Sequence, residues 1–207
     1  MTDWADLDRY RSANAALAAP APGDDRVVFM GDSITDAWPR IGPFFAGKPY
    51  VGRGIGGQTT PQMLVRFRAD VVALRPRVVV LLAGINDIAG NTGPSTPEMI
   101  QDNLRSMVEI AHANGIRVVL GSILPAFDFP WRPGLQPAAK VVAMNAWIKT
   151  YAESHGCIYL DYFTALADDR GGLPDQFAED GIHPNRAGYA VMERLAADAI
   201  ARALAQP

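Results

Sequence analysis

The sequence predicts an α/β protein in which helices cover both faces of a parallel sheet, a three-layer α/β/α sandwich. Short apolar runs of strand length alternate with longer segments whose apolar residues recur at helical spacing, as in repeated βαβ units. Runs such as RVVVLLAG and IRVVLGS are continuously apolar, which is typical of parallel strands buried on both faces. No repeat, low-complexity tract or linker interrupts the 207 residues, so we expect one domain over 1–207.

Five apolar runs are predicted to be the strands of this sheet. In chain order they are Val27–Met30, Tyr50–Gly52, Val78–Ala83, Arg117–Gly121 and Cys157–Leu160. Because helical patterns separate these runs, we expect right-handed crossover connections between parallel neighbours.

Helical patterns fill the intervals between the runs. Thr96 and Pro97 are residue types preferred at an N-cap and a first helical position, and apolar residues then recur at helical spacing until Gly115. Further helices are predicted from Pro61 to about Leu74, from Pro137 to Gly156, and as a long amphipathic helix behind Pro184. Residues 1–24 are predicted to form a helical lead-in to the domain.

Composition and charge exclude several classes of protein. A net charge of −3 gives no long-range attraction toward nucleic acid, and no apolar run is long enough to span a membrane. The single cysteine, Cys157, excludes an internal disulfide and is interpreted as a small buried hydrophobe. The N-terminal stretch MTDWADLDRYRSANAAL lacks the apolar core of a secretory signal. The compartment and the oligomeric state stay open.

Glycines and polar residues follow the predicted strands, where the carboxyl ends of a parallel sheet place a functional site. In chain order, the segments that follow the strands are GDSIT, GRGIGGQTT, GIND, SILPAFDFPWRPG and EDGIHPN. Because these ends share one edge of the sheet, we expect their polar side chains to meet there.

Ser33, in the first of these segments, is a candidate nucleophile. A serine needs a base, and the base needs an orienting partner. His183 precedes Pro184, which forces it out of helical geometry, and Asp180 lies three residues earlier, within reach of one imidazole nitrogen. The other nitrogen is then free for Ser33, so these residues predict a serine hydrolase.

Other titratable residues are interpreted as structural. His112 lies inside the predicted helix that ends at Gly115, and His155 lies in the last turn of another helix, where a cation suits the helix dipole. Asp32 is expected to fix the turn into a helix that begins at Ser33. The residues expected to hold neighbouring loops rather than substrate are Arg53, Gln58 and Asp87.

Acyl transfer also requires hydrogen-bond donors aimed at a developing oxyanion, and three candidates are present. They are the backbone N–H of Ser33 at a helix start, the backbone N–H of Gly54 after the second strand, and the side-chain amide of Asn86 after the third strand.

The glycine pattern over Gly52–Gly57 permits a different interpretation. G-x-G-x-x-G between a strand and a helix also occurs in dinucleotide-binding oxidoreductases. Here the pattern follows the second strand rather than the first, and the third run ends in LLAG, without an acid to hold a ribose. A non-catalytic binding module is a further alternative, but it leaves the combination of Ser33, His183 and Asp180 unexplained.

Four short blocks, in order, resemble those of the SGNH hydrolases, also called GDSL esterases/lipases. GDSIT resembles the first block, with Ser33 as nucleophile, and RGIGGQTT resembles the second, with Gly54 as an oxyanion donor. GIND resembles the third block, with Asn86 as the other donor, and DGIHP resembles the last, with Asp180 and His183 completing the triad. Together the blocks span most of the chain.

This resemblance implies a flavodoxin-like, five-stranded sheet of order 2-1-3-4-5 and a serine hydrolase that uses no metal or organic cofactor. Its substrates are expected to be short-chain carboxyl esters or, as the alternative, acetylated carbohydrates. Close relatives usually carry Asn where this chain has Gly52. Bacterial relatives with a similar N-terminal stretch often begin with an export signal, so periplasmic, secreted and cytoplasmic locations all stay open.

The only long loop expected over the site is PAFDFPWRPGLQP, after the fourth strand. Its aromatic residues, which form either a substrate wall or a cover for the core, are Phe127, Phe129 and Trp131. No apolar insertion is long enough to build a lid or an acyl tunnel, so we expect a preference for acyl chains from acetyl to butyryl.

Overall fold

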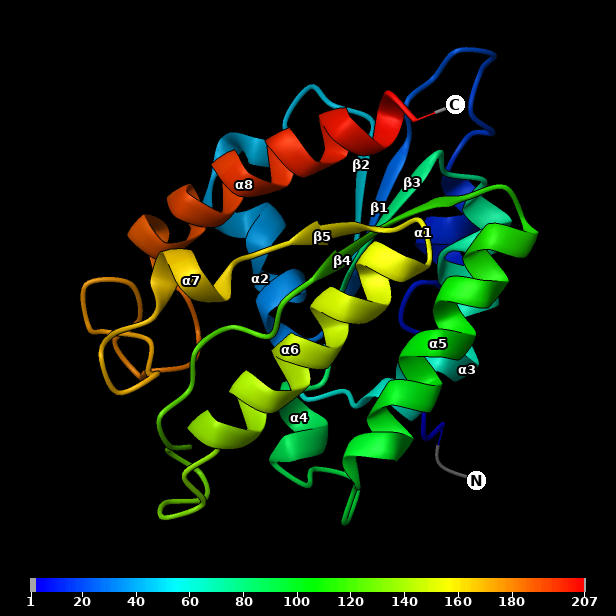
Figure 1. Cartoon of the computed structure of the whole chain (residues 1–207). Helices are drawn as coiled ribbons and strands as arrows, with labels where there is room; N and C mark the ends of the chain where they lie inside the picture. Colours follow the sequence, from blue (N-terminus) through cyan, green and yellow to red (C-terminus); the bar gives the residue numbers. More distant parts are fainter. Residues whose placement is uncertain (1–2, 207) are drawn as a thin grey trace.

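The computed structural model describes residues 3–206 and confirms the predicted α/β fold, with helices on both faces of a parallel sheet (Figure 1). The strand order is β2-β1-β3-β4-β5, which is the order implied by the family resemblance. The strands are β1 (Val27–Gly31), β2 (Tyr50–Gly54), β3 (Val78–Leu82), β4 (Arg117–Gly121) and β5 (Ile158–Leu160).

The strands of the sheet centre face an apolar core on each side. In β3, Val79 and Leu81 belong to one core, while Val78 and Val80 belong to the other. This two-sided burial explains why the run is continuously apolar rather than alternating. The register sets Gly31, at the end of β1, beside Gly54 of β2, so the carboxyl ends of these strands stop at one level.

Helices form the two outer layers. α3 (Thr60–Asp70), α5 (Pro97–Ala113) and α6 (Ala138–Ser154) cover one face, and α2 (Ser33–Ile41) and α8 (Arg186–Leu204) cover the other (Figure 1). The shorter elements are α1 (Arg11–Ala16), α4 (Ile85–Ile88), α7 (Phe163–Leu166) and 3-10 turns at Pro43–Phe45 and Val72–Leu74.

The helix ends follow the signals in the sequence, with one difference. Thr96 caps α5 by accepting a hydrogen bond from the backbone N–H of Met99 at 3.3 Å. The helix predicted to reach about Leu74 ends earlier, at Asp70, and the chain continues as a 3-10 turn. Pro76 disfavours helical geometry in the residue before it, which limits how far α3 could extend.

The N-terminal segment, predicted as a helical lead-in, is helical only over α1 among its described residues. It lies against β2, an edge strand of the sheet, and against α3. Tyr10 donates its hydroxyl proton to the carbonyl of Gly54, and the Asn14 amide donates to the Asp70 carboxylate at 2.7 Å. The segment therefore braces the end of β2.

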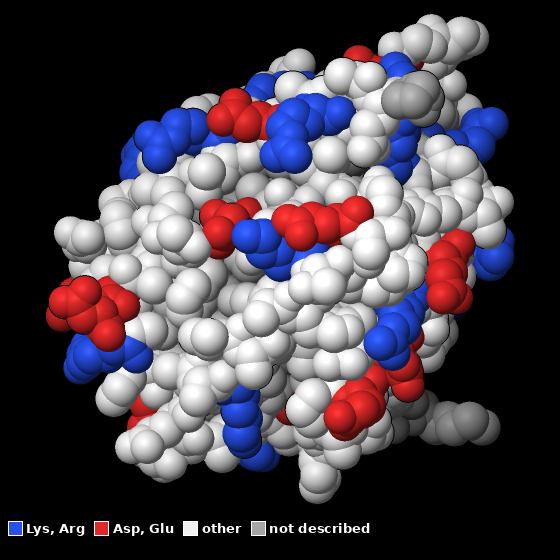
Figure 2. Space-filling model, viewed as in Figure 1, with Lys and Arg blue, Asp and Glu red and all other residues white. Residues whose placement is uncertain are grey.

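The surface carries both signs of charge without a large patch of either sign on the face seen in Figure 2. This distribution agrees with the net charge of −3. Among residues 3–206, no helix combines the length and the apolar character needed to cross a bilayer.

Candidate active site

A surface depression of about 300 Å³ opens where the strands end. The residues that line it are Ser33, Gly57, Asn86, Asn91, Trp131 and His183. They come from the segments that follow β1, β2, β3 and β4 and from the loop before α8. The carboxyl-end edge of the sheet thus collects polar side chains from segments far apart in the sequence, as expected for a parallel α/β sheet.

Ser33, His183 and Asp180 form a continuous hydrogen-bonded chain at this depression. Ser33 Oγ lies 2.9 Å from His183 Nε2, and His183 Nδ1 lies 2.6 Å from Asp180 Oδ2. The second carboxylate oxygen of Asp180 accepts the backbone N–H groups of Ile182 and His183, at 2.9 and 2.7 Å. The structure thus brings Ser33 together with Asp180 and His183, which lie in a segment far from it in the sequence.

The electrostatics of Asp180 suit a carboxylate that orients an imidazole. Partial burial pushes the pKa of Asp180 upward, but hydrogen bonds from the His183 side chain and from the backbone of His183 and Ile182 outweigh it and lower the pKa. Asp180 is therefore ionised at neutral pH and holds the proton of His183 on Nδ1, which leaves Nε2 to accept the proton of Ser33.

Ser33 occupies the first position of α2. Asp32 precedes it as the N-cap and accepts the backbone N–H of Ile34 at 3.0 Å. In the described part of the chain, no hydrogen bond uses the backbone N–H of Ser33, as expected at a helix start. Asp32 thus fixes the turn, as expected, and the Ser33 N–H is available to a ligand.

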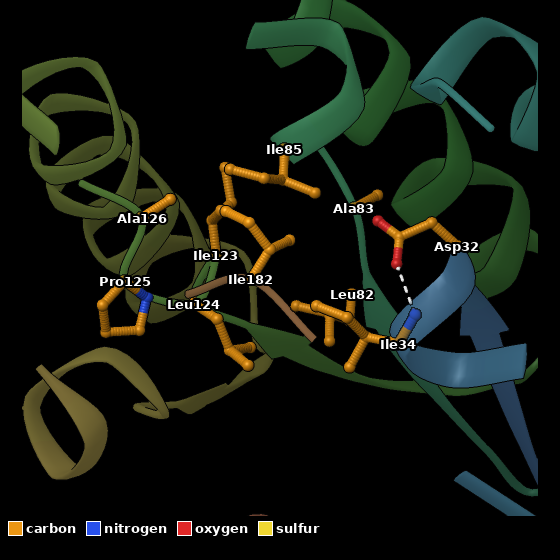
Figure 3. A pocket seen from close by; sticks show the side chains of 10 residues that line it. All are labelled: Asp32, Ile34, Leu82, Ala83, Ile85, Ile123, Leu124, Pro125, Ala126 and Ile182. Carbon is orange, nitrogen blue, oxygen red and sulfur yellow. Dashed lines mark hydrogen bonds between the residues drawn. The ribbon is translucent and has the colours of Figure 1, made fainter. Parts of the chain in front are cut away.

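Asp32 is buried, with only 1% of its surface exposed. Figure 3 shows its carboxylate among apolar side chains from β3, α4, the segment after β4 and the loop before α8. These side chains enclose a cavity of about 10 Å³. Burial among them raises the pKa of Asp32 to about 6.

Asn86 lies in the short helix α4 and reaches the depression with its side-chain amide. One N–H of this amide is donated to the carbonyl of Gln58 at 3.0 Å. The other N–H is left for the depression, so Asn86 can act as a donor to an oxyanion there.

Gly54, which was expected to supply an oxyanion donor, is not among the residues that line the depression. It is packed beneath the start of α2, where an added Cβ would lie 2.0 Å from the backbone nitrogen of Asp36 and 2.6 Å from the carbonyl oxygen of Asp32. Its role in this structure is to let α2 approach β2 closely.

Gly57, three residues later in the chain, is the glycine of this segment that lines the depression. Its φ of +76° belongs to a tight turn in which Gln58 donates its backbone N–H to the carbonyl of Ile55 at 3.3 Å. Among the described residues, no hydrogen bond uses the backbone N–H of Gly57. The glycine pair just before the predicted helix was the signal in the sequence that could have pointed to this turn.

The glycine pattern over Gly52–Gly57 is accounted for by packing. A Cβ at Gly52 would meet Pro39 of α2 at 2.8 Å, and one at Gly54 would meet the backbone of α2 at 2.0 Å. Gly57 supplies the positive φ of the turn. The dinucleotide interpretation is not needed to explain these glycines.

Arg66 of α3 is fully buried and hydrogen-bonds to the ends of both β1 and β2. It donates to the carbonyls of Gly31 and Arg53 at 3.0 and 2.9 Å, and to the Gln58 side chain at 2.6 Å. Its charge is paired with Asp70 at 3.0 Å. Nothing in the sequence distinguishes Arg66, because its spacing within the helix resembles that of an ordinary polar residue.

The three residues expected to hold loops make contacts of that kind. Asp87 accepts the backbone N–H and the hydroxyl of Thr60, at 3.0 and 2.6 Å. Arg53 and Gln58 bond through their side chains to the N-terminal segment. None of the three lines the depression.

The aromatic loop after β4 contributes one of its three candidate residues. Trp131 is 44% exposed, lines the depression, and lies with its ring centroid 6.3 Å from that of His183. Phe129 is buried behind Trp131 and belongs to the core, while Phe127 packs against Arg170 outside the depression.

The remaining histidines and the cysteine lie away from the depression. His155 ends α6 and stacks on Tyr151, and His112 lies in the last turn of α5. Cys157 is buried, and burial raises the pKa of its thiol to about 12. Within residues 3–206, no group of three or more metal-ligating side chains is found.

Residues 29–191 match the model of the GDSL-like Lipase/Acylhydrolase family. A GDSL-like lipase from Bacteroides thetaiotaomicron has a crystal structure with a TM-score of 0.94 and 44% identity, covering 97% of this chain and 100% of that one. Esterase TesA of Pseudomonas aeruginosa is 31% identical over 139 residues, 65% of this chain and 60% of the esterase. The match therefore spans less than two thirds of that esterase.

More distant structures share the fold. The acetylxylan esterase Axe2 of Geobacillus stearothermophilus is 20% identical, with a TM-score of 0.69, over 85% of this chain and 94% of that chain.

Proposed function

This chain belongs to the GDSL-like Lipase/Acylhydrolase family, a family of carboxylic ester hydrolases, and we propose that it hydrolyses short-chain carboxyl esters with Ser33 as nucleophile. The observation that carries the proposal is the hydrogen-bonded chain from Ser33 through His183 to Asp180 at the floor of an open depression. A nucleophile, its base and an orienting carboxylate in hydrogen-bond reach are the parts that acyl transfer requires.

The reaction proceeds in two halves. Ser33 Oγ attacks the ester carbonyl carbon while His183 Nε2 takes its proton, giving a tetrahedral oxyanion. The intermediate collapses by breaking the bond to the alcohol oxygen, which leaves with the proton from His183, and the acyl group stays on Ser33. Water then repeats the sequence against the acyl-enzyme, with His183 again as base and acid, and releases the carboxylic acid. Asp180 stabilises the imidazolium in both halves.

The oxyanion is held by three donors: the backbone N–H groups of Ser33 and Gly57 and the side-chain amide of Asn86. All three residues line the depression, and each has an N–H without a partner among the described residues. One such donor is worth about 10²–10³ in kcat, because it is oriented before charge develops.

Trp131 is the part of the aromatic loop that forms a substrate wall. Its exposed ring lies beside His183 and gives the depression one apolar side. That exposed face also favours a second candidate function, deacetylation of acetylated carbohydrates with the same triad, because the C–H face of a sugar ring can cover an aromatic ring. Axe2 shares the fold of this chain, so its activity supports this second candidate only by analogy.

Ser33→Ala tests the proposal directly. We expect the variant to lose several orders of magnitude in kcat toward 4-nitrophenyl acetate, because the nucleophile is absent, with an unchanged unfolding midpoint. A fluorophosphonate probe should label the unmodified protein at Ser33, as located by peptide mass mapping.

The matched control is Ser106→Ala, which removes a half-buried serine on α5 that does not line the depression and should change neither activity nor labelling. Turnover by Ser33→Ala close to that of the unmodified protein, or a label on another residue, would contradict the proposed nucleophile.

A further inference from the structure

Asn91 connects the two oxyanion donors that do not belong to α2. Its side-chain nitrogen donates one hydrogen to the carbonyl oxygen of Gly57 at 3.2 Å and the other to Asn86 Oδ1 at 2.9 Å. The backbone N–H of Asn91 also donates to the carbonyl of Asn86 at 3.0 Å. A single exposed residue thus holds the loop after β2 and the helix after β3 together at the edge of the depression.

These contacts fix the direction of the Asn86 amide. Its oxygen accepts from Asn91, and one of its hydrogens goes to Gln58, so the amide plane is held on both sides. Only one direction remains for the second N–H, which can meet the oxyanion. Without Asn91, the amide oxygen would lose its partner and the group could rotate about its terminal torsion.

The same contacts fix Gly57. Glycine at positive φ has little resistance of its own to backbone rotation, because it carries no Cβ. The bond from Asn91 holds the carbonyl of Gly57, and the turn bond from Gln58 to Ile55 closes the turn that presents the Gly57 N–H.

We propose that Asn91 is a positioning residue that holds the N–H groups of Gly57 and Asn86 on one oxyanion. This inference rests on the proposed esterase function and assigns Asn91 no contact with the reacting atoms. Donors that are oriented before the reaction cost no reorganisation in the transition state, so removing Asn91 should affect the transition state more than substrate binding.

Thr92 offers a matched control in the same loop. Its hydroxyl lies 3.0 Å from the hydroxyl of Thr59 and links the same two segments of the chain, but it touches neither donor and does not line the depression. Thr92→Val therefore removes a hydrogen bond of similar length and exposure without changing the oxyanion donors.

The first test compares kcat and KM for 4-nitrophenyl acetate. We expect Asn91→Ala to lower kcat by about 10- to 100-fold, because small displacements of catalytic donors have effects of this order, while KM changes by less than about twofold. Asn91→Asp should lower kcat further, because an ionised carboxylate donates no hydrogen and places negative charge beside the oxyanion. Thr92→Val should leave kcat unchanged, and the unfolding midpoints should match.

Two further measurements separate positioning from a structural role. A trifluoromethyl ketone, which forms a tetrahedral oxyanion adduct on serine, should lose affinity for Asn91→Ala in parallel with the loss of kcat. In an Asn86→Ala background, Asn91→Ala should lower kcat by a smaller factor, because only the positioning of Gly57 is then lost. Coupled residues are not additive in this way.

The inference is overturned if Asn91→Ala lowers kcat no more than Thr92→Val does, or if the effects of Asn91→Ala and Asn86→Ala simply multiply. Failure of the proposed esterase function can be distinguished from failure of the proposed role of Asn91. If the unmodified protein has no Ser33-dependent esterase activity, both fail. If Ser33-dependent activity is present and Asn91→Ala retains it in full, only the role of Asn91 fails.

Discussion

At the residue scale, two aspartates near Ser33 have opposite environments. Asp180 is partly exposed and accepts three hydrogen bonds from Ile182 and His183, which lower its pKa. Asp32 is buried among apolar side chains and accepts the N–H of Ile34, and its pKa is raised to about 6. The difference separates the carboxylate proposed to orient His183 from the one that shapes the turn.

Asp180→Asn should lower kcat by about 10³–10⁴, because an amide that donates to His183 Nδ1 leaves the proton on Nε2, where the base must accept one. The measurement is kcat for 4-nitrophenyl acetate at pH 7. Asp175→Asn, an equal charge change at an exposed position in the same loop, should leave kcat unchanged. A loss smaller than about tenfold for Asp180→Asn would mean that another group orients His183.

Asp32→Asn should alter the pH dependence of stability. Because the pKa of Asp32 is raised from 3.8 to about 6 in the folded protein, the folded state keeps this proton while the unfolded state loses it, and the free energy of unfolding falls as pH rises from about 4 to 6. Asparagine can still accept the N–H of Ile34 and has no proton to lose. Relative to the unmodified protein, the variant should gain about 1–3 kcal/mol between pH 4 and pH 7.

Urea unfolding at several pH values measures this difference. A difference that stays constant from pH 4 to pH 7 would show that Asp32 is ionised at the lower pH in the folded protein as well, and that burial does not control its charge.

At the scale of elements, the site depends on how closely α2 lies against β2. Gly54 lies at this contact, where a Cβ would overlap the backbone of Asp36 and Asp32 rather than a side chain that could move aside. Since α2 carries Ser33 at its first residue, a shift of this helix would displace the hydroxyl of the proposed nucleophile and its N–H together.

Gly54→Ala should therefore destabilise the protein by several kcal/mol, about 3 or more, and reduce activity in the folded fraction. The matched control is Gly56→Ala, because the nearest heavy atom to a Cβ there is Ser33 Cβ at 3.8 Å, an ordinary contact. Thermal unfolding and kcat of the two variants test this. Equal stability of both variants would show that α2 can move away from β2 without cost.

At the scale of the whole molecule, the site is an open depression rather than an enclosed tunnel. Its lining residues come from every strand-end segment, and Trp131 supplies its apolar wall. Phe129, which could have extended that wall, is buried in the core. Under the proposed function, the acyl group of a bound ester would meet only a short apolar surface before it reaches water.

We expect kcat/KM for 4-nitrophenyl esters to be highest for acyl chains of about two to four carbons. An enclosed methylene contributes about 0.8 kcal/mol to binding, but methylenes beyond the wall stay in contact with water and add little. Esters of two to twelve carbons, measured below their aggregation limits, test this. A steady rise through eight carbons or more would show that an acyl groove continues beyond Trp131.

The sequence was sufficient to predict the fold and the segments that meet at the candidate site. The alternation of apolar runs and helical patterns predicts the layered fold, and the turn residues after each run mark the carboxyl ends of the strands. Ser33, Asn86, Asp180 and His183 could be selected because each lies in such a segment and carries a chemically distinctive side chain. Their proximity follows from the fold, since parallel strands end at one edge of the sheet.

Only the tertiary structure decided which of two residues of the same type, or in the same loop, lies at the depression. Gly54 and Gly57 have no side chain to distinguish them, and packing of α2 on β2 buries the first while a turn exposes the second at the depression. Phe129 and Trp131 are both aromatic, yet one enters the core and the other faces His183. The sequence identifies a residue's type and the segment in which it lies. The direction of an N–H group or of a ring depends on contacts with distant elements.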